Sequence, residues 1–224
     1  MLNLNNKIIF SWDVFNWSRS LNIWKKHSNI EKGNLNCLEI GAGPGGISLW
    51  VASYDNNILC TEYDNNMQIA RDLHKVFNAQ NIEYSNLDVL NIPFENHFDI
   101  IILKSVLGGL GNNNNIDLAI QQIHKSLKPE GYFLFAENLK GSMLLMWLRR
   151  RFSGCGTWWN YMDYKQFKQG ISIFNEVNMK RMGVFGVLGR NEFQKAVIGA
   201  SDMYLLELIL PKNTFYIVAG VARK

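Results

Sequence analysis

The feature that most constrains this chain is an apolar run that ends in a cluster of glycines, CLEIGAGPGG, at residues 37–46. Gly41, Gly43 and Gly45 allow a tight turn and let the backbone approach a ligand closely. A helical segment, GISLWVAS, begins at once, so its N-terminal amides would point at whatever occupies the turn. This order of strand, glycine turn and helix predicts an α/β domain with a ligand at the turn.

The surrounding sequence supports an α/β domain, because short apolar runs alternate with helical stretches over residues 35–137. The expected strands are 35–40, 57–62, 82–86, 98–103 and 131–137. Several of them are apolar throughout, as expected when helices cover both faces of a parallel sheet. Later in the chain we expect a helix at 163–174 and strands at 176–182 and 214–224. Apolar residues at helical spacing predict a single N-terminal helix; they are Phe10, Val14, Trp17, Leu21 and Trp24.

Composition narrows the class of protein. The 224 residues are 47% hydrophobic and 19% charged, which suits one domain with a sizeable core. Lys and Arg (23) exceed Asp and Glu (19) too little to demand nucleic acid as a partner. No apolar run approaches the ~20 residues of a membrane-spanning helix. We expect a cytoplasmic protein, because the N-terminus does not resemble a signal peptide and the spacing of Cys37, Cys60 and Cys155 fits no metal site.

The glycine turn alone leaves its ligand open, because GAGPGG also satisfies the G-x-G-x-x-G pattern of dinucleotide-binding proteins. Three acids provide further information. Glu39 precedes the first glycine and could hold an ammonium group, and Glu62 ends the second strand, where ribose hydroxyls are bound. Asp88 follows the third strand and could accept from an adenine amino group. Three acids around the turn suit a cationic adenosine ligand better than a pyrophosphate.

Four motifs then occur in the order typical of one family: EIGAGPGG, TEYDNNMQIAR, LDVLNIPFENHFDIIILKSVLGGL and LKPEGYFLFAE. With them, residues 35–137 resemble the class I S-adenosylmethionine-dependent methyltransferases. The resemblance implies a Rossmann-like three-layer sandwich whose seven-stranded, mostly parallel sheet has an antiparallel last strand. It implies S-adenosylmethionine as methyl donor and S-adenosylhomocysteine as product. We expect one domain over 1–224, with an N-terminal helical lid at 1–34, a cofactor-binding core at 35–137, and a substrate cap formed by 138–162 and 183–211.

Carried over position by position, the resemblance implies a donor site along the carboxyl ends of the first four strands. The glycine turn would line the methionine part of the donor, and the acid that ends the second strand would take the ribose. The segment after the fourth strand would face the sulfonium. The residues implied in cofactor binding are Glu39, Gly41, Ala42, Gly43, Gly45, Glu62, Tyr63, Met67, Asp88, Val89, Lys104, Ser105 and Val106.

Methyl transfer from a sulfonium depends mainly on alignment and on exclusion of water. For a hydroxyl acceptor a general base contributes ~10²–10⁴-fold. Glu137, at the end of the fifth strand, is the best-placed carboxylate, with Tyr161 and Asp163 as fallbacks. The four histidines are expected at the surface. We expect no metal, because Lys104 stands where metal-dependent members of the family need a cation ligand.

The acceptor is expected at the cap, where aromatic and basic residues concentrate. Arg150, Trp158 and Trp159 are the predicted substrate residues, since aromatic faces suit a sugar or ring and arginine suits a phosphate or carboxylate. The segment LLMWLRRRF is also compatible with a helix lying on a membrane surface. The leading prediction is a methyltransferase that acts at oxygen on a small-molecule or sugar-like acceptor. A non-catalytic binding or scaffold protein with the same fold, and a NAD-dependent oxidoreductase, remain as alternatives.

Overall fold

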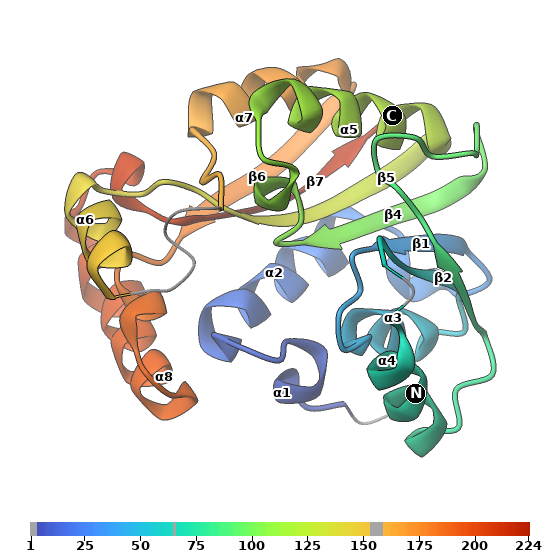
Figure 1. Ribbon diagram of the computed structural model, residues 1–224, viewed down its shortest axis with the longest axis horizontal. Helices are drawn as coiled ribbons and strands as arrows, with labels where there is room; N and C mark the ends of the chain where they lie inside the picture. The colour runs from blue at the N-terminus through green and yellow to red at the C-terminus, as the bar shows by residue number, and fades with distance from the viewer. Residues whose placement is uncertain (1–3, 65, 153–158) are drawn as a thin grey trace.

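The computed structural model describes residues 4–64, 66–152 and 159–224. Its centre is a sheet of seven strands in the order β3-β2-β1-β4-β5-β7-β6 (Figure 1). β7 is antiparallel to both of its neighbours, so the other six strands share one direction. The predicted fold class is therefore confirmed. The strands are β1 Asn36–Ile40, β2 Asn57–Glu62, β3 Ile82–Asn86, β4 Phe98–Lys104, β5 Leu127–Asn138, β6 Glu176–Met182 and β7 Ile217–Arg223.

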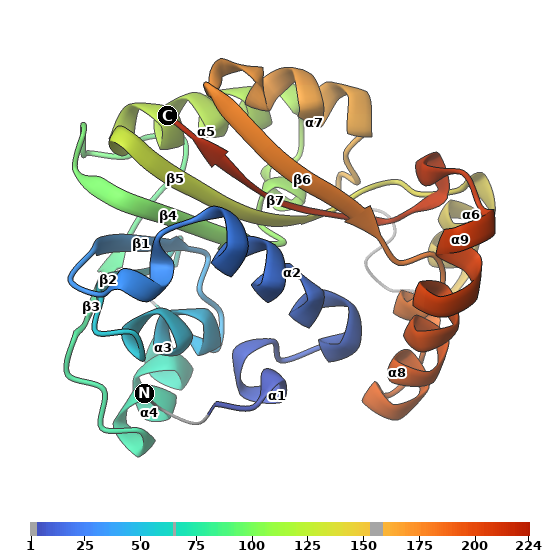
Figure 2. The ribbon, with the colours of Figure 1, turned by 180° about the vertical axis from the view of Figure 1, so that it is seen from behind.

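Helices cover both faces of the sheet and one of its edges (Figures 1 and 2). One face carries α1 Asn6–Ile9, α2 Val14–His27, α3 Gly46–Ala52 and α4 Gln68–Val76. The other face carries α5 Asn113–Ser126 and α7 Tyr164–Gly170. At the edge toward which β4 points lie α6 Met143–Phe152, α8 Glu192–Ser201 and α9 Glu207–Ile209. Short 3₁₀ turns span Ile30–Lys32, Leu107–Leu110, Ile171–Ile173, Gly186–Leu188 and Lys212–Thr214, and a π-helical turn spans Asp202–Leu206.

Each face of the sheet has its own apolar core. On the α2 side the fully buried residues include Trp17 and Trp24, and on the α5 side they include Phe133 and Phe135. Burying one such side chain contributes about 1.5–3 kcal/mol relative to leaving it exposed. Two cores explain why the central strands are apolar throughout, because both of their faces are covered.

The N-terminal segment differs from the single helix predicted from its apolar spacing. α1 and α2 are separate, and between them Asp13 adopts the left-handed conformation with φ of 45°. The backbone N–H groups of Asp13 and Val14 donate to the carboxylate of Glu192 at 3.0 and 2.9 Å. Because α8 supplies the acceptor for these two amides, α2 can begin here rather than continue from Phe10. The break lets residues 8–12 fold back over the glycine turn, and the carbonyl of Ile8 packs directly on Gly46.

The segments after β5 and β6 leave the sheet at the same edge, because β5 and β6 run in the same direction. Two acids fasten the segment after β6. The Asp202 carboxylate accepts from the amides of residues 184–186 at 2.7–2.8 Å, and Glu207 pairs bidentately with Arg19 of α2. The structure thus brings 138–152, 159–162 and 183–211 to the edge at which the sequence predicts them.

Candidate functional site

A cavity of about 430 Å³ lies at the carboxyl ends of β1 and β4. Its walls come from distant parts of the chain: residues 8–12, the glycine turn, the ends of β4 and β5, and residues of the segments that follow β5 and β6. In open α/β sheets this edge is the usual ligand-binding position. The cavity is therefore the candidate functional site.

Two positions of the turn require glycine for different structural reasons. A Cβ on Gly41 would come within 2.6 Å of the Val106 side chain, so this glycine lets the turn pack against the segment after β4. Gly43 has a φ of +52°, and a Cβ there would meet no atom within 4 Å. Gly43 lines the cavity, so the space that its missing side chain leaves belongs to the cavity.

Two acids lie close to the turn. Glu39 of β1 lines the cavity, is only 2% exposed, and accepts a hydrogen bond from the Ser48 hydroxyl. Burial raises the pKa of Glu39 to about 8, against the opposing effects of the Ser48 hydrogen bond and the Lys104 charge. Glu62, at the end of β2, accepts from the Gly43 N–H and so holds the turn open from outside the cavity.

The other residues predicted for the adenosine part of the donor lie beyond the cavity wall. Met67 and Val89 are buried, whereas Tyr63 is 78% exposed. Asp88 accepts from the Leu90 N–H at 2.9 Å. Of the predicted cofactor residues, the cavity brings together Glu39, Gly41, Ala42, Gly43, Lys104 and Ser105, and does not include Gly45, Glu62, Tyr63, Met67, Asp88, Val89 and Val106.

His74 corrects the expectation that all four histidines lie at the surface. It is 1% exposed, with Nε2 2.7 Å from the Gly45 carbonyl oxygen and Nδ1 2.8 Å from the Tyr84 hydroxyl. Because a carbonyl only accepts, Nε2 carries the proton and Nδ1 accepts from the tyrosine. His74 thus supports the glycine turn from behind. Its spacing of four from the buried Ala70 could have indicated a buried position.

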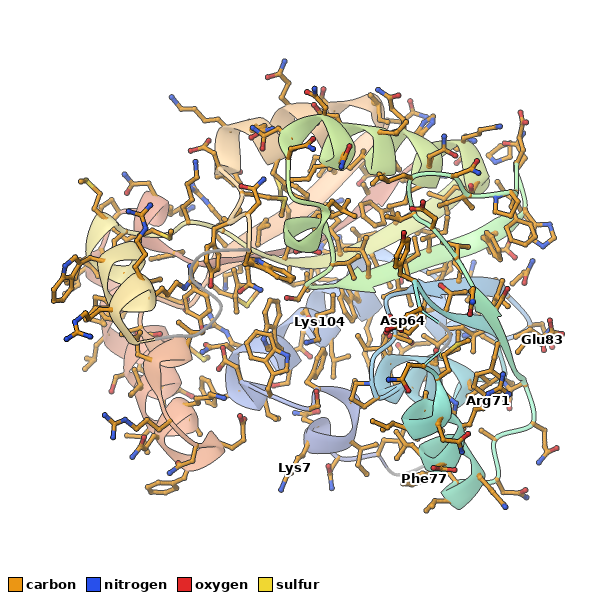
Figure 3. The ribbon with its side chains drawn as sticks, in the orientation of Figure 1. Lys7, Asp64, Arg71, Phe77, Glu83 and Lys104 are labelled. Atoms are coloured by element: carbon orange, nitrogen blue, oxygen red, sulfur yellow. The ribbon has the colours of Figure 1, made fainter. Side chains whose placement is uncertain are left out.

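Lys104 is the last residue of β4 (Figure 3), and both it and the following Ser105 line the cavity. The Lys104 ammonium lies 4.7 and 4.9 Å from the ring centroids of Trp12 and Trp17, and burial lowers its pKa to about 8. Ser105 has a φ of +57°, a conformation that costs a non-glycine residue energy and that is common at functional sites. Its hydroxyl accepts from the Asn138 amide at 2.8 Å, and both residues line the cavity.

The three predicted base candidates have different surroundings. Glu137 is fully buried and does not line the cavity, and its Oε1 accepts from the Val106 and Leu107 amides at 2.6 and 2.9 Å. Burial raises its pKa to about 7. Tyr161 lines the cavity. Asp163 caps α7 by accepting from the Lys165 N–H at 2.8 Å. Catalysis by Glu137 stays a prediction, and its visible contacts anchor the turn after β4.

The predicted acceptor residues also differ in whether they line the cavity. Trp159 lines the cavity and packs so closely on Gly108 that a Cβ there would lie 2.3 Å from the indole. Arg150 is exposed on α6, whereas its neighbour Arg149 is buried and lines the cavity. Trp158 lies outside the described residues. From the sequence Arg150 is selected rather than Arg149, although the spacing of four between Arg149 and the buried Leu145 marks the inner face of the helix.

The described residues contain no group of three or more His, Cys, Asp or Glu side chains arranged to hold a metal ion. Among the described helices, none is long and apolar enough to cross a membrane.

Comparison with known proteins points to one domain type. Residues 38–135 match the family model described as a methyltransferase domain. The chain is 34% identical over 143 residues to a demethylmenaquinone methyltransferase of Leptospira interrogans, covering 58% of this chain and 56% of the relative. It is 31% identical over 134 residues to a ubiquinone/menaquinone biosynthesis C-methyltransferase of Pseudomonas putida, covering 55% and 51%. The chain thus spans about half the length of the curated relatives it matches.

Solved structures show the same fold. Phosphoethanolamine N-methyltransferase 2 of Haemonchus contortus, in complex with S-adenosyl-L-methionine, superposes with a TM-score of 0.67 at 17% identity, covering 98% of this chain and 56% of that one. The [4+2]-cyclase SpnF superposes with a TM-score of 0.62 at 16% identity, covering 92% and 80%. At these identities the likeness concerns the fold alone, and proteins with different described activities share it.

Proposed function

This chain belongs to the class I S-adenosylmethionine-dependent methyltransferases, and on that premise we propose that it transfers a methyl group to the oxygen of a small-molecule or sugar-like acceptor. The observation that carries the proposal is the cavity itself. The open space at Gly43 and the buried carboxylate of Glu39 face the same volume, beside a wall of aromatic residues. A ligand with an ammonium group fits the first part, and a ring fits the second.

The residues around the glycine turn fit the donor. When bound, S-adenosylmethionine supplies a methyl group already activated by its sulfonium. Gly43 leaves the space for the methionine part, Glu39 would hold the ammonium, and Glu62 would bind the ribose while keeping its bond to the turn. Met67, Asp88 and Val89 remain the proposed neighbours of the adenine.

The other walls would position the acceptor. Trp12, Trp159 and Tyr161 offer ring faces for stacking, and residues 8–12 fold over the turn and would exclude water from the reacting groups. Because Tyr161 reaches the cavity and Glu137 does not, Tyr161 is the base that we propose for a hydroxyl acceptor. As the phenolate, its oxygen would take the acceptor's proton and become the neutral phenol as the acceptor oxygen is methylated.

A second candidate is methylation at carbon. The two curated relatives are described as methyltransferases of menaquinone or ubiquinone biosynthesis, and the second is described as a C-methyltransferase. A planar ring acceptor suits the same aromatic walls. Mass spectrometry of the methylated product separates the two candidates, because an O-methyl group gives a characteristic loss on fragmentation that a C-methyl group does not.

The donor site is tested by calorimetry with S-adenosylhomocysteine and with NAD. We expect S-adenosylhomocysteine to bind and to raise the melting temperature, since it stabilises only the folded state, and we expect no binding of NAD. Glu62→Gln should weaken S-adenosylhomocysteine binding by about 1.5–3 kcal/mol, the range for a hydrogen bond to a charged group. The matched control is Glu83→Gln, an exposed acid on β3.

Three outcomes would count against this assignment. Binding of NAD alone would favour the oxidoreductase, and equal affinity in Glu62→Gln would remove Glu62 from the ribose site. If S-adenosylhomocysteine binds but labelled S-adenosylmethionine transfers no methyl group to any class of small-molecule acceptor, the non-catalytic alternative is favoured instead.

We also propose that α6 contacts a membrane surface. Its outer face exposes Met143 (91%), Leu144 (54%) and Trp147 (60%), and the exposed Arg150 and Arg151 follow at its end. Apolar residues beside arginines are typical of helices that lie at an anionic lipid interface. We expect the protein to sediment with phosphatidylglycerol vesicles more than with phosphatidylcholine vesicles, and Trp147→Ser to reduce this. Equal recovery with both vesicle types and with the variant would contradict the proposal.

A further inference from the structure

Arg149 is a buried cation whose hydrogen bonds are only partly used. It is 2% exposed on the inner face of α6 and lines the cavity. Its Nη1 donates to the carbonyl oxygens of Leu139 and Lys140 at 2.9 and 3.2 Å. Nε and Nη2 are buried and have no hydrogen-bond partner in the part of the chain that the structure describes. Unused buried donors are rare in folded proteins, because leaving them unsatisfied costs free energy.

The guanidinium is held so that this unused edge is fixed. Its carbon lies 4.1 Å from the Tyr161 ring centroid and 5.3 Å from that of Tyr216, and the two Nη1 bonds set its rotation. Nε and Nη2 together form the side edge through which arginine binds a carboxylate or phosphate with two parallel hydrogen bonds. Because the Arg149 side chain is already held in one position, it loses little further conformational freedom when an anion binds to this edge.

The two cations at this cavity, Arg149 and Lys104, form no ion pair with an acid of the described residues. Glu137, Glu39 and Asp13 attract the Lys104 charge from a greater distance, and Asp13 also attracts that of Arg149. The nearby Asp13 uses its two oxygens to accept from Tyr216 and Asn16 at 2.6 and 3.1 Å. Among the described residues, Glu39 is the only acid that lines the cavity. A buried guanidinium without an ion-pair partner is costly, so this edge favours the binding of an anionic ligand.

We infer that the Nε and Nη2 edge of Arg149, in a cavity that Lys104 also lines, is the binding site for an oxyanion carried by the methyl acceptor, a carboxylate or a phosphate. The inference rests on the proposed function, and it adds the chemical class of the acceptor. Arg149 belongs to the wall that also contains Trp159 and Tyr161, so the acceptor would place its ring against these aromatic residues and its anion at Arg149. The residues proposed for the donor come from other elements, β1 and the glycine turn.

The test uses benzoate as probe, added to protein saturated with S-adenosylhomocysteine and followed by calorimetry or NMR. We expect benzoate to bind at millimolar concentration and benzamide, which is neutral and of the same shape, to bind at least tenfold more weakly. Phenyl phosphate is the second arm, and the tighter of the two anions identifies the source of the oxyanion. Arg149→Lys keeps the charge and a donor for the two carbonyls but lacks the fork, and should weaken the preferred anion about tenfold, or 1.4 kcal/mol.

The controls distinguish an effect on anion binding from an effect on folding or on the donor site. Lys168→Gln removes an exposed charge on α7 and should leave anion binding unchanged. Arg149→Lys should keep its melting temperature within a few degrees and its S-adenosylhomocysteine affinity within about threefold.

The inference would be overturned by unchanged anion binding in Arg149→Lys, by equal binding of benzamide, or by no binding of either anion. A large loss of S-adenosylhomocysteine affinity in Arg149→Lys would instead assign Arg149 to the donor. If wild type binds the anion through Arg149 but never binds S-adenosylhomocysteine, the proposed function fails and the anion site stands.

Discussion

Replacing Gly43 by valine is expected to abolish the binding of S-adenosylhomocysteine and the rise in melting temperature that it causes. The added side chain has open space before it, so it would enter the cavity instead of disturbing the protein around it. It would then occupy the volume proposed for the methionine part of the ligand. We expect affinity to fall by about 100-fold or more, which corresponds to ~2.7 kcal/mol.

The chain offers a matched control for the backbone effect. Gly111 also has a positive φ (+79°), a Cβ there would also meet no atom within 4 Å, and it does not line the cavity. Both Gly43→Val and Gly111→Val should lose about 1–2 kcal/mol of stability, because valine disfavours the left-handed region. Only Gly43→Val should lose the ligand. Comparable loss of binding in Gly111→Val, or normal binding in Gly43→Val, would show that the donor site is elsewhere.

Removing the carboxylate of Glu137 is expected to destabilise the protein strongly. Glu137→Leu leaves the amides of Val106 and Leu107 without their acceptor in a buried site, at about 1–3 kcal/mol for each. We expect the free energy of unfolding, measured with denaturant, to fall by about 2–6 kcal/mol. Glu137→Gln retains an oxygen that can accept both bonds and should lose much less. Equal losses in the two variants would show that the anchoring bonds are not what Glu137 contributes.

The contribution of Glu137 to folding stability should depend on pH with a definite sign. The pKa of Glu137 is about 7 in the folded protein and its ordinary value is 4.5, so between these pH values the folded state holds a proton that the unfolded chain has lost. The stability from this group is fully present below pH 4.5 and is lost as pH rises through 7, by up to about 3 kcal/mol. Glu137→Gln should remove the part of this slope that Glu137 contributes, whereas Asp13 and Glu39, whose pKa values are also raised, should keep a weaker slope of the same sign. An unchanged slope in Glu137→Gln would contradict the contribution of Glu137.

Glu137→Gln also tests catalysis independently of folding. A folded variant with unchanged S-adenosylhomocysteine affinity but strongly reduced turnover would restore Glu137 as the general base, because a base acts in the transition state. Retained turnover would leave Tyr161 as the remaining base candidate that reaches the cavity.

The glycine turn, the mostly parallel sheet with its antiparallel last strand and most element positions could be predicted, because their signals are local or follow a family pattern. Positive φ at Gly41, Gly43 and Gly45 is what the motif requires, and apolar runs with both faces covered read directly as central strands. The break after Phe10 could not be predicted, because the group that begins α2 is Glu192, 178 residues away from Val14. Local spacing describes what a helix would bury, whereas a distant acceptor decides where it begins.

By itself, the sequence determined the α/β class, the glycine turn and the acids expected around it, because each depends on neighbouring residues or on short motifs. Tertiary structure alone decided which side chains meet at the cavity. Arg149 and Arg150 are adjacent in the chain, yet one is buried beside Tyr161 and the other is exposed, because successive residues of a helix point about 100° apart. Glu137 likewise lies at the end of β5 as predicted, but its carboxylate points toward the backbone amides that follow β4. A buried carboxylate is most stable where backbone N–H groups donate hydrogen bonds to it.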